Sequence, residues 1–309
     1  MTPRHARVHP VKPLLKWVGG KRQLLPELRR FYPAAFDRYV EPFFGSGAVF
    51  FDLHASGRLA EREAVLIDSN PDLVGCYETV RDTPDDVATA LDTLAAAHAL
   101  DARAHYFAVR DTQFNPLREQ RRMPDGRIAY TPALAAMFIY LNRTGFNGLF
   151  RVNASGEFNV PPGRYNRPKI ADRDKLARVS AALNASGVSL HFGSFEAALD
   201  VAGAGHFVYF DPPYAPLSRT ANFTSYTAPR FTHDDQVRLQ AVVVELAGRG
   251  CHVLASNSAA AEIAELYEHN AAALAAGVRT YRVPARRAIN SNPARRGPVE
   301  ELVMTNVLI

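Results

Sequence analysis

The chain has 309 residues, 47% of them hydrophobic and 22% charged, with a net charge of +5. This length suits one large domain or two ordinary ones, and it excludes a small disulfide-stapled scaffold. Two distant cysteines, Cys76 and Cys251, argue against a zinc site and against an oxidising compartment. Apolar runs are strand-length and residues 1–10 lack an apolar core, so we expect an intracellular protein with no membrane span and no signal peptide.

Strand-like apolar runs occur in two groups along the chain. The first group is 39–43 and 64–68, and the second is 189–192, 207–211, 251–256, 280–283 and 302–307. Helical stretches such as 234–247 lie between several of them, which predicts an α/β fold with a largely parallel sheet and helices on both faces. The last two runs follow each other without a helix, which favours an antiparallel hairpin at one edge.

The pattern changes to helical between residues 79 and 187. Residues 85–99, 101–114 and 131–142 have helical character, with Pro132 at a first helical position. Residues 143–168 follow and are dense in Gly, Asn, Pro and Arg. We therefore expect residues 79–187 to form an inserted second domain, and residues 1–78 and 188–309 together to form the first.

Two early segments indicate a nucleotide-type ligand. A strand ending at Glu41, which could meet a charged ligand group, leads into Gly45-Ser46-Gly47, where glycines permit close backbone approach. Asp68 closes the next strand 21 residues beyond Gly47, a spacing at which an acid binds the ribose hydroxyls of an adenosine cofactor. Phe50 replaces the third glycine of a dinucleotide fingerprint, which disfavours NAD and FAD. The alternatives are an ordinary strand–helix turn and a helix N-cap at Asp68.

The strongest signal is Asp211-Pro212-Pro213-Tyr214, directly after the apolar run 207–210. Its carboxylate stands at the carboxyl end of a central strand, where open α/β sheets bind ligands. The two prolines stiffen the segment and prevent regular strand pairing. A carboxylate, two prolines and an aromatic residue in this place indicate an active-site loop rather than a simple turn.

Basic residues gather in three segments, 1–30, 110–170 and 279–296. These hold eight basic residues against one acid, ten against four, and six against none. Three such segments could form one face that meets a polyanion. The alternative is three separate solvated surfaces, and composition does not choose between them.

With these motifs in place, the chain resembles the Dam-like DNA adenine-N6 methyltransferases. The resemblance rests on segments 15–21, 41–47, 142–153, 156–161 and 163–165, together with Asp68 and the Asp-Pro-Pro-Tyr loop, in the family's order. It implies a Rossmann-like methyltransferase fold, with a mixed seven-stranded sheet and helices on both faces. It also implies an inserted, mainly helical DNA-recognition domain with a β-hairpin, whose turn we place at 153–156 and whose return strand we place at 157–161.

The resemblance implies S-adenosylmethionine as the cofactor. Asp68 would take its ribose hydroxyls, and the turn would approach its methionine moiety. Trp17 and Lys21 match the family's N-terminal cofactor motif, with Lys21 suited to the methionyl carboxylate. The cofactor residues expected in full are Trp17, Lys21, Glu41, Phe44, Gly45, Ser46, Gly47, Asp68 and Asp211.

The resemblance assigns the chemistry to Asp211, Pro212, Pro213 and Tyr214. The Asp211 carboxylate and the Pro212 carbonyl would accept both N–H bonds of adenine N6, and so hold a poorly nucleophilic nitrogen in line with the methyl group. Tyr214 would stack on the base. Because the amine is inaccessible inside a duplex, the base must flip out.

The resemblance also implies duplex DNA as partner and a set of reading residues: Lys16, Arg143, Phe146, Asn147, Leu149, Arg151, Pro161 and Arg164. Arginine can read guanine edges and asparagine can read adenine. Phe146 stands where the family inserts an aromatic residue into the space of the flipped base. The hairpin most resembles that of GATC methylases, so GATC is the expected target, while any single arginine could instead be a plain surface residue.

Several alternatives stay open. N4-cytosine enzymes of the same fold typically carry Ser at the position of Asp211. RNA or protein-glutamine enzymes more often carry Asn there and would lack the hairpin of residues 146–165. A DNA-binding module without catalysis is a further class. No metal ligand set is expected, because the ten histidines are scattered. We expect a cytoplasmic, nucleoid-associated monomer of prokaryotic or phage-like origin. Its role would be in mismatch repair or regulation, or beside a cognate restriction endonuclease.

Overall fold

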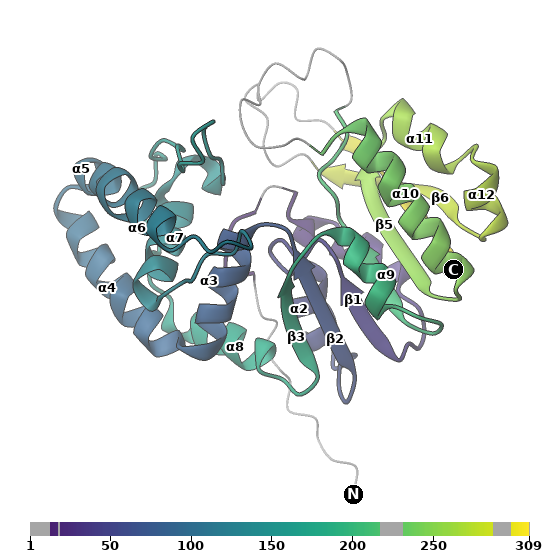
Figure 1. The fold of residues 1–309 in the computed structure, drawn as a ribbon, viewed down its shortest axis with the longest axis horizontal. Helices are drawn as coiled ribbons and strands as arrows, with labels where there is room; N and C mark the ends of the chain where they lie inside the picture. The colour runs from purple at the N-terminus through teal and green to yellow at the C-terminus, as the bar shows by residue number, and fades with distance from the viewer. Residues whose placement is uncertain (1–12, 18, 217–230, 287–297, 309) are drawn as a thin grey trace, which may run out of the picture.

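The structure is a computed structural model that describes residues 13–17, 19–216, 231–286 and 298–308. A seven-stranded sheet lies at its centre, in the order β3-β2-β1-β4-β5-β7-β6 (Figure 1). The strands are β1 (Arg38–Glu41), β2 (Glu63–Asp68), β3 (Val188–Phe192), β4 (Phe207–Phe210), β5 (His252–Ser258), β6 (Arg279–Arg286) and β7 (Pro298–Thr305). β1 to β5 pair in parallel, and β7 runs antiparallel between β5 and β6. The mixed seven-stranded sheet and the antiparallel edge hairpin are confirmed.

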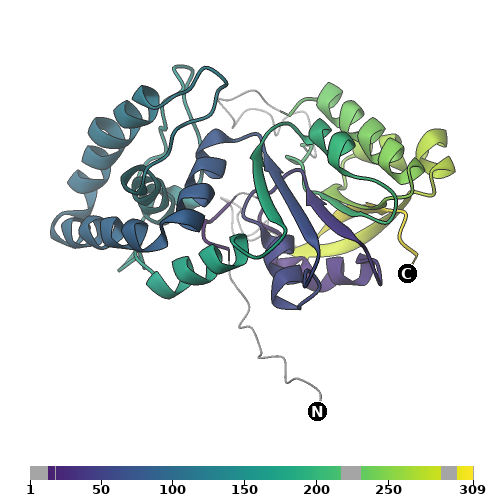
Figure 2. The same cartoon turned by 60° about the horizontal axis from the view of Figure 1, so that its bottom comes forward.

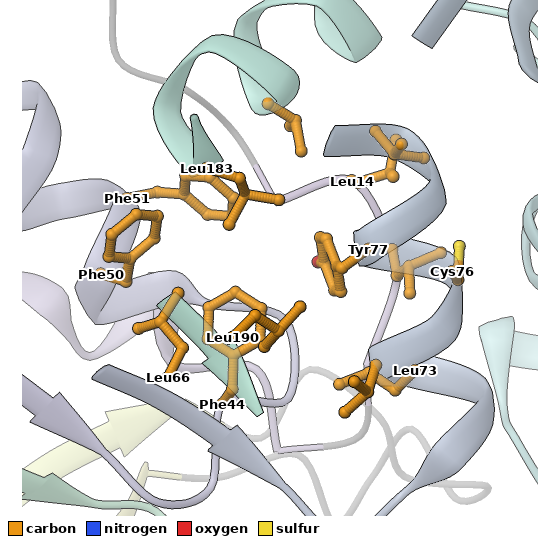
Figure 3. Packing of buried hydrophobic residues seen from close by; sticks show 14 of the residues in the cluster. Leu14, Phe44, Phe50, Phe51, Leu66, Leu73, Cys76, Tyr77, Leu183 and Leu190 are labelled. Carbon is orange, nitrogen blue, oxygen red and sulfur yellow. The ribbon is translucent and has the colours of Figure 1, made fainter. Parts of the chain in front are cut away.

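Hydrophobic residues cover both faces of this sheet. Side chains alternate between faces along a strand, and Tyr39 and Val40 of β1 accordingly enter two different hydrophobic clusters. One face is covered by α2 (Ala48–Ala55), α3 (Pro71–Asp82) and α8 (Arg173–Leu183), whose packing around Phe44, Tyr77 and Leu183 appears in Figure 3. On the other face lie α9 (Ala198–Val201), α10 (His233–Gly248), α11 (Ala261–Tyr267) and α12 (Ala271–Ala275).

Further helices gather beyond the β3 side of the sheet, away from α10 to α12 (Figures 1 and 2). They are α4 (Pro84–Leu100), α5 (Ala102–Phe107), a π-helical segment (Ala108–Phe114), α6 (Asn115–Gln120) and α7 (Pro132–Thr144). The helix expected at 101–114 is therefore part of a longer helical run over 102–120, which contains the π-helical segment. The expected boundary between residues 78 and 79 falls inside α3, and one hydrophobic cluster runs from the sheet into α4 and α7. The two-domain division stays a prediction.

The described residues also contain short helices: Lys21–Gln23, α1 (Leu25–Leu28), Arg29–Phe31, Phe146–Gly148 and Phe195–Ala197. No helix in the described ranges is long and apolar enough to cross a bilayer.

The hairpin after α7 is present but poorer in strand structure than expected. Its turn lies at 153–156, where the Asn153 N–H donates to the Glu157 carbonyl over 2.8 Å. Only Val152 and Phe158 form an antiparallel bridge there, so the expected return strand 157–161 is wrong as a regular strand. The Asn159 N–H donates to the Arg151 carbonyl over 3.1 Å, while the Phe158 N–H donates to the Asn115 side chain and Pro161 has no N–H for a further ladder bond.

Candidate active site

A cavity of about 840 Å³ opens at the carboxyl ends of the parallel strands. Its walls include Trp17, residues 19–21, the β1–α2 turn, the residues after β2, the hairpin residues 150–152, residues 194–195, the loop 211–214, and residues at the start of α10. The expected cofactor residues line it with one exception, Gly47, and so do Asp211, Pro212, Pro213 and Tyr214. The topology thus gathers segments that lie far apart in the sequence.

The β1–α2 turn depends on its glycines. Gly45 and Gly47 have φ angles of +50° and +68°, in the left-handed region that favours glycine. A Cβ on Gly47 would lie 2.5 Å from the Phe44 ring. Gly47 therefore serves the packing beneath the turn and is not among the lining residues of the cavity, and its contact with a cofactor stays a prediction.

Asp68 ties this turn to the end of β2. Its Oδ2 accepts the Gly45 N–H over 2.8 Å, and its Oδ1 accepts the Asn70 N–H over 2.9 Å. Burial raises the pKa of Asp68 to about 6, so the carboxylate form predominates at neutral pH. Each oxygen can accept one more hydrogen bond. Asn70, not Asp68, is the N-cap of α3, so the capping alternative for Asp68 is wrong.

Glu41 is a second buried carboxyl group in the cavity wall. Its side chain is 2% exposed, and Oε2 accepts the Tyr39 hydroxyl over 2.8 Å and the Phe50 N–H over 3.2 Å. Burial raises the pKa of Glu41 well above its usual range. A cationic group in the cavity would favour its charged form.

Lys21 and Asp211 form an ion pair at the floor of the cavity. The ammonium lies 2.6 Å from Asp211 Oδ1, is 4% exposed, and also donates to the Gly19 carbonyl over 2.7 Å. It stands 4.3 Å from the centre of the Tyr214 ring. Burial raises the pKa of Asp211, and Lys21 opposes that rise. Lys21, expected at a cofactor carboxylate, pairs with Asp211 here because a buried ammonium needs a counter-charge.

Four residues that sequence reasoning missed hold the 211–214 loop. Ser256 donates to Asp211 Oδ1 over 3.2 Å, and Gln236 donates to the Pro213 carbonyl over 3.0 Å. Asn257 accepts the Ala215 N–H over 3.2 Å, and the Tyr214 hydroxyl donates to Glu301 over 2.5 Å. Ser256 and Asn257 could have been suspected, because they lie near the carboxyl end of β5, the strand next to β4. Gln236 and Glu301 carry no local signal.

Several expected DNA-binding residues lie exposed around the hairpin. Phe146 is 48% exposed, and its N–H donates to the carbonyl of exposed Pro161 over 2.8 Å. Asn147 is exposed with a φ of +54°. Arg151 lines the cavity, and its Nε donates to Asn159 over 2.7 Å.

Lys16 and Arg164 are exposed too, and the Lys16 ammonium lies 4.0 Å from the centre of the Tyr165 ring. Residues 1–12 and 287–297, from two of the basic segments, lie outside the described residues.

Arg143 and Leu149 are less exposed than the other expected DNA-binding residues. Arg143 donates to the Leu14 carbonyl over 2.9 Å and to the Lys169 carbonyl over 3.2 Å, and burial lowers its pKa. Its guanidinium is committed to backbone carbonyls rather than turned outward. Leu149 is half-buried against the hydrophobic core. For these two residues a contact with DNA stays a prediction that their surroundings do not favour.

Asn142 joins the N-terminal segment to the turn that carries Phe146. Its Oδ1 accepts the Lys16 N–H over 2.8 Å, and its Nδ2 donates to the carbonyls of Lys16 and Gly148 over 2.7 and 3.0 Å. In the sequence, the amide of Asn142 at the end of an apolar helix could have indicated this role. Among the residues that the structure describes, no group of three His, Cys, Asp or Glu side chains could hold a metal ion.

Comparison with known proteins identifies the family. The D12 class N6 adenine-specific DNA methyltransferase family matches residues 17–288. The type II methyltransferase M1.LlaDCHI of Lactococcus lactis subsp. cremoris is 36% identical, covering 96% of this chain and 95% of that protein. M.MjaIII of Methanocaldococcus jannaschii, also a type II methyltransferase, is 37% identical, with coverages of 96% and 99%. A DNA adenine methylase of Serratia marcescens is 36% identical, with coverages of 94% and 96%. The chain therefore belongs to the D12 class of N6 adenine-specific DNA methyltransferases.

Proposed function

We propose that the enzyme transfers a methyl group from S-adenosylmethionine to adenine N6 within GATC in duplex DNA, after flipping the base out of the helix. The observation that carries this proposal is one cavity lined both by Asp68 and by the Asp211–Tyr214 loop. A carboxylate suited to a ribose and a loop suited to an exocyclic amine thus face a common space.

The residues present fit S-adenosylmethionine. The cavity volume, about 840 Å³, lies within the usual range for small-molecule sites. Asp68 offers acceptors to ribose hydroxyls, and Glu41 offers a counter-charge to an ammonium group. Phe43 and Phe195, stacked with ring centres 5.4 Å apart, provide an apolar wall suited to a purine. When bound, the cofactor supplies an electrophilic methyl group on a sulfonium.

Asp211 orients the attacking amine. Lys21 and Ser256 both contact Oδ1, which leaves Oδ2 to accept one N–H bond of adenine N6. The Pro212 carbonyl accepts the other N–H bond. Held by two acceptors, the nitrogen can become tetrahedral as the new C–N bond forms. The bond between that methyl group and the sulfonium sulfur would break in the same step and leave a neutral thioether, and the amine would release one proton to solvent. Lys21 favours the ionised form of Asp211 that this role requires.

Tyr214 and Phe146 serve the flipped base and the duplex. The Tyr214 ring stacks on the extruded adenine, and its hydrogen bond to Glu301 fixes the ring plane. Phe146, exposed at 48%, enters the space that the adenine leaves. Arg151 and Asn147 reach base edges, while Lys16 and Arg164 reach phosphates or bases, so DNA binding weakens steeply with salt.

GATC as the target rests on the likeness of the hairpin to GATC methylases. The N4-cytosine alternative is disfavoured by Asp211, since those enzymes typically carry Ser there. Relatives that are named DNA adenine methylase and type II methyltransferase support two settings, a regulatory methylase or the partner of a restriction endonuclease. We propose that the enzyme acts as a cytoplasmic monomer.

The test uses purified enzyme, methyl-labelled S-adenosylmethionine, and duplexes that differ only at one GATC. Nucleoside analysis by mass spectrometry is expected to show N6-methyladenine in the GATC duplex alone. A duplex with 2-aminopurine at the target adenine is expected to brighten on binding, as a flipped base does. N4-methylcytosine as product would establish the alternative, and binding without any labelled base would establish a non-catalytic module.

A further inference from the structure

A buried ion pair joins the start of α3 to α6. Asp72 is fully buried and Arg118 is 6% exposed. The guanidinium is bidentate, with Nε 2.6 Å from Asp72 Oδ1 and Nη2 2.8 Å from Oδ2. The Tyr130 hydroxyl donates to the same Oδ1 over 2.9 Å. Such a pair has one defined geometry, because a fork of donors meets a planar carboxylate.

Arg118 has a third contact, and this one reaches the hairpin. Its Nη1 donates to the carbonyl of Gly156, in the hairpin turn. Earlier on α6, Asn115 accepts the Phe158 N–H over 2.9 Å and donates to the Phe158 carbonyl over 3.0 Å. The helix therefore holds the hairpin at two points.

The other end of the network leads to the cofactor cavity. Asp68 Oδ1 accepts the Asn70 N–H, and Asn70 Oδ1 in turn accepts the Asp72 N–H over 3.0 Å. Four consecutive hydrogen-bonded links thus run from the Asp68 carboxylate through Asn70, Asp72 and Arg118 to Gly156.

We propose that Arg118 is a positioning residue for sequence discrimination: it fixes the hairpin turn relative to the cofactor cavity. This inference rests on the proposed function, in which the hairpin reads DNA. Arg118 is buried and acts through Gly156 rather than on DNA. Arginine is required, because a lysine ammonium is a point charge that cannot span Asp72 and the Gly156 carbonyl together.

The test compares Arg118→Lys with a matched control, Arg122→Lys. Arg122 follows α6 and pairs with Glu119 over 3.0 Å. For each protein, kcat/KM is measured on the preferred duplex and on duplexes with one base pair changed. Cofactor affinity is followed by the fluorescence of Trp17, the single tryptophan, which lines the cavity. Thermal melting reports the fold.

Arg118→Lys is expected to lower the ratio of kcat/KM on the preferred duplex to kcat/KM on an altered duplex about tenfold. This is the size of effect expected when one good base contact is lost. The KM for DNA rises, while kcat at saturating DNA and cofactor affinity stay near wild type. Arg122→Lys changes none of these. If Arg118→Lys does not fold, Asn115→Ser, which removes a hairpin contact without leaving a buried charge, is expected to show the same relaxed ratio.

An unchanged ratio in a folded Arg118→Lys enzyme, or an equal loss on every duplex together with lost cofactor affinity, overturns the assignment. The proposed function fails separately if the wild-type enzyme shows no sequence preference, or if Arg151→Ala leaves that preference intact. A preference that Arg151→Ala relaxes and Arg118→Lys preserves rejects the role of Arg118 alone.

Discussion

The Lys21 ammonium and the Asp211 carboxylate lie 2.6 Å apart at the floor of the cavity, with the lysine side chain only 4% exposed. The pair joins the N-terminal segment to the loop after β4, and its ammonium opposes the rise that burial causes in the pKa of Asp211. It also leaves Asp211 Oδ2 free of both Lys21 and Ser256. The chemistry that we assign to Asp211 depends on this arrangement.

Asp211→Ala should lower the rate of methyl transfer at least about 100-fold, because the amine loses its orienting acceptor. Binding of duplex DNA should remain largely intact. The variant should also lose roughly 3 kcal/mol of stability, since a buried ammonium is left unpaired. Methylation assays, DNA titrations and thermal melts measure the three quantities.

The control is the double variant Lys21→Met with Asp211→Ala. Replacing both charges by apolar groups should restore most of the stability without restoring activity. Near-wild-type methylation by Asp211→Ala would refute the role assigned to Asp211.

Asp68 should make the cofactor-free enzyme less stable as pH rises from about 4 to 6. Burial raises the pKa of Asp68 from 3.8 to about 6, so within this window the folded chain binds more protons than the unfolded chain. The contribution of Asp68 to the unfolding free energy therefore falls with rising pH, by up to about 3 kcal/mol, and levels off above pH 6. Denaturant titrations across this range should show the slope, and Asp68→Asn should make it shallower, leaving the contributions of buried Glu41 and Asp211, whose pKa values burial also raises.

Cofactor affinity should follow the opposite trend, because ribose hydroxyls donate to the ionised carboxylate of Asp68. The Kd for S-adenosylmethionine, followed by Trp17 fluorescence, should rise by up to about tenfold for each pH unit below pH 6. An Asp68→Asn enzyme that keeps the full pH dependence would show that another group controls binding.

Arg151→Ala should relax sequence preference rather than merely weaken binding. Losing one bidentate base contact costs about 1–3 kcal/mol of discrimination at a single position. Arg143→Ala is the contrast, because its guanidinium ties the Leu14 and Lys169 carbonyls and its loss should lower stability with preference unchanged. Methylation of a panel of duplexes measures both, and a uniform loss across the panel for Arg151→Ala would count against base reading.

Asn142→Ala should destabilise the fold by about 2–3 kcal/mol, since it leaves the Lys16 and Gly148 backbone groups without their partner. It should also raise the KM for DNA, because the turn carrying Phe146 loses its tie to the N-terminal segment. Thermal melts and DNA titrations check the two effects. A variant as stable as wild type would show that water replaces the amide.

The sheet was largely predictable from the sequence, because its strands are local apolar runs that end in recognisable turns. The cavity residues at 41–46, 68 and 211–214 were predictable for the same reason. Local sequence does not encode which distant partner a side chain meets. The pairing of Lys21 with Asp211, the inward commitment of Arg143, and the hydrogen bond of Tyr214 to Glu301 all arise from tertiary packing.

The hairpin shows a further limit of local patterns. Its turn at 153–156 was predictable from the sequence. Its return segment keeps backbone hydrogen bonds to Arg151 and Asn153, but it also bonds to Asn115 on α6, a helix that lies far away in the sequence.

The most direct test of the central claim is modified-base sequencing of plasmid DNA from methylation-deficient cells that express this chain, with the Asp211→Ala variant as the matched control. We predict N6-methyladenine on both strands of GATC sites in the wild-type culture and none in the variant culture. N4-methylcytosine, or no modified base despite soluble, folded enzyme, would contradict the assignment.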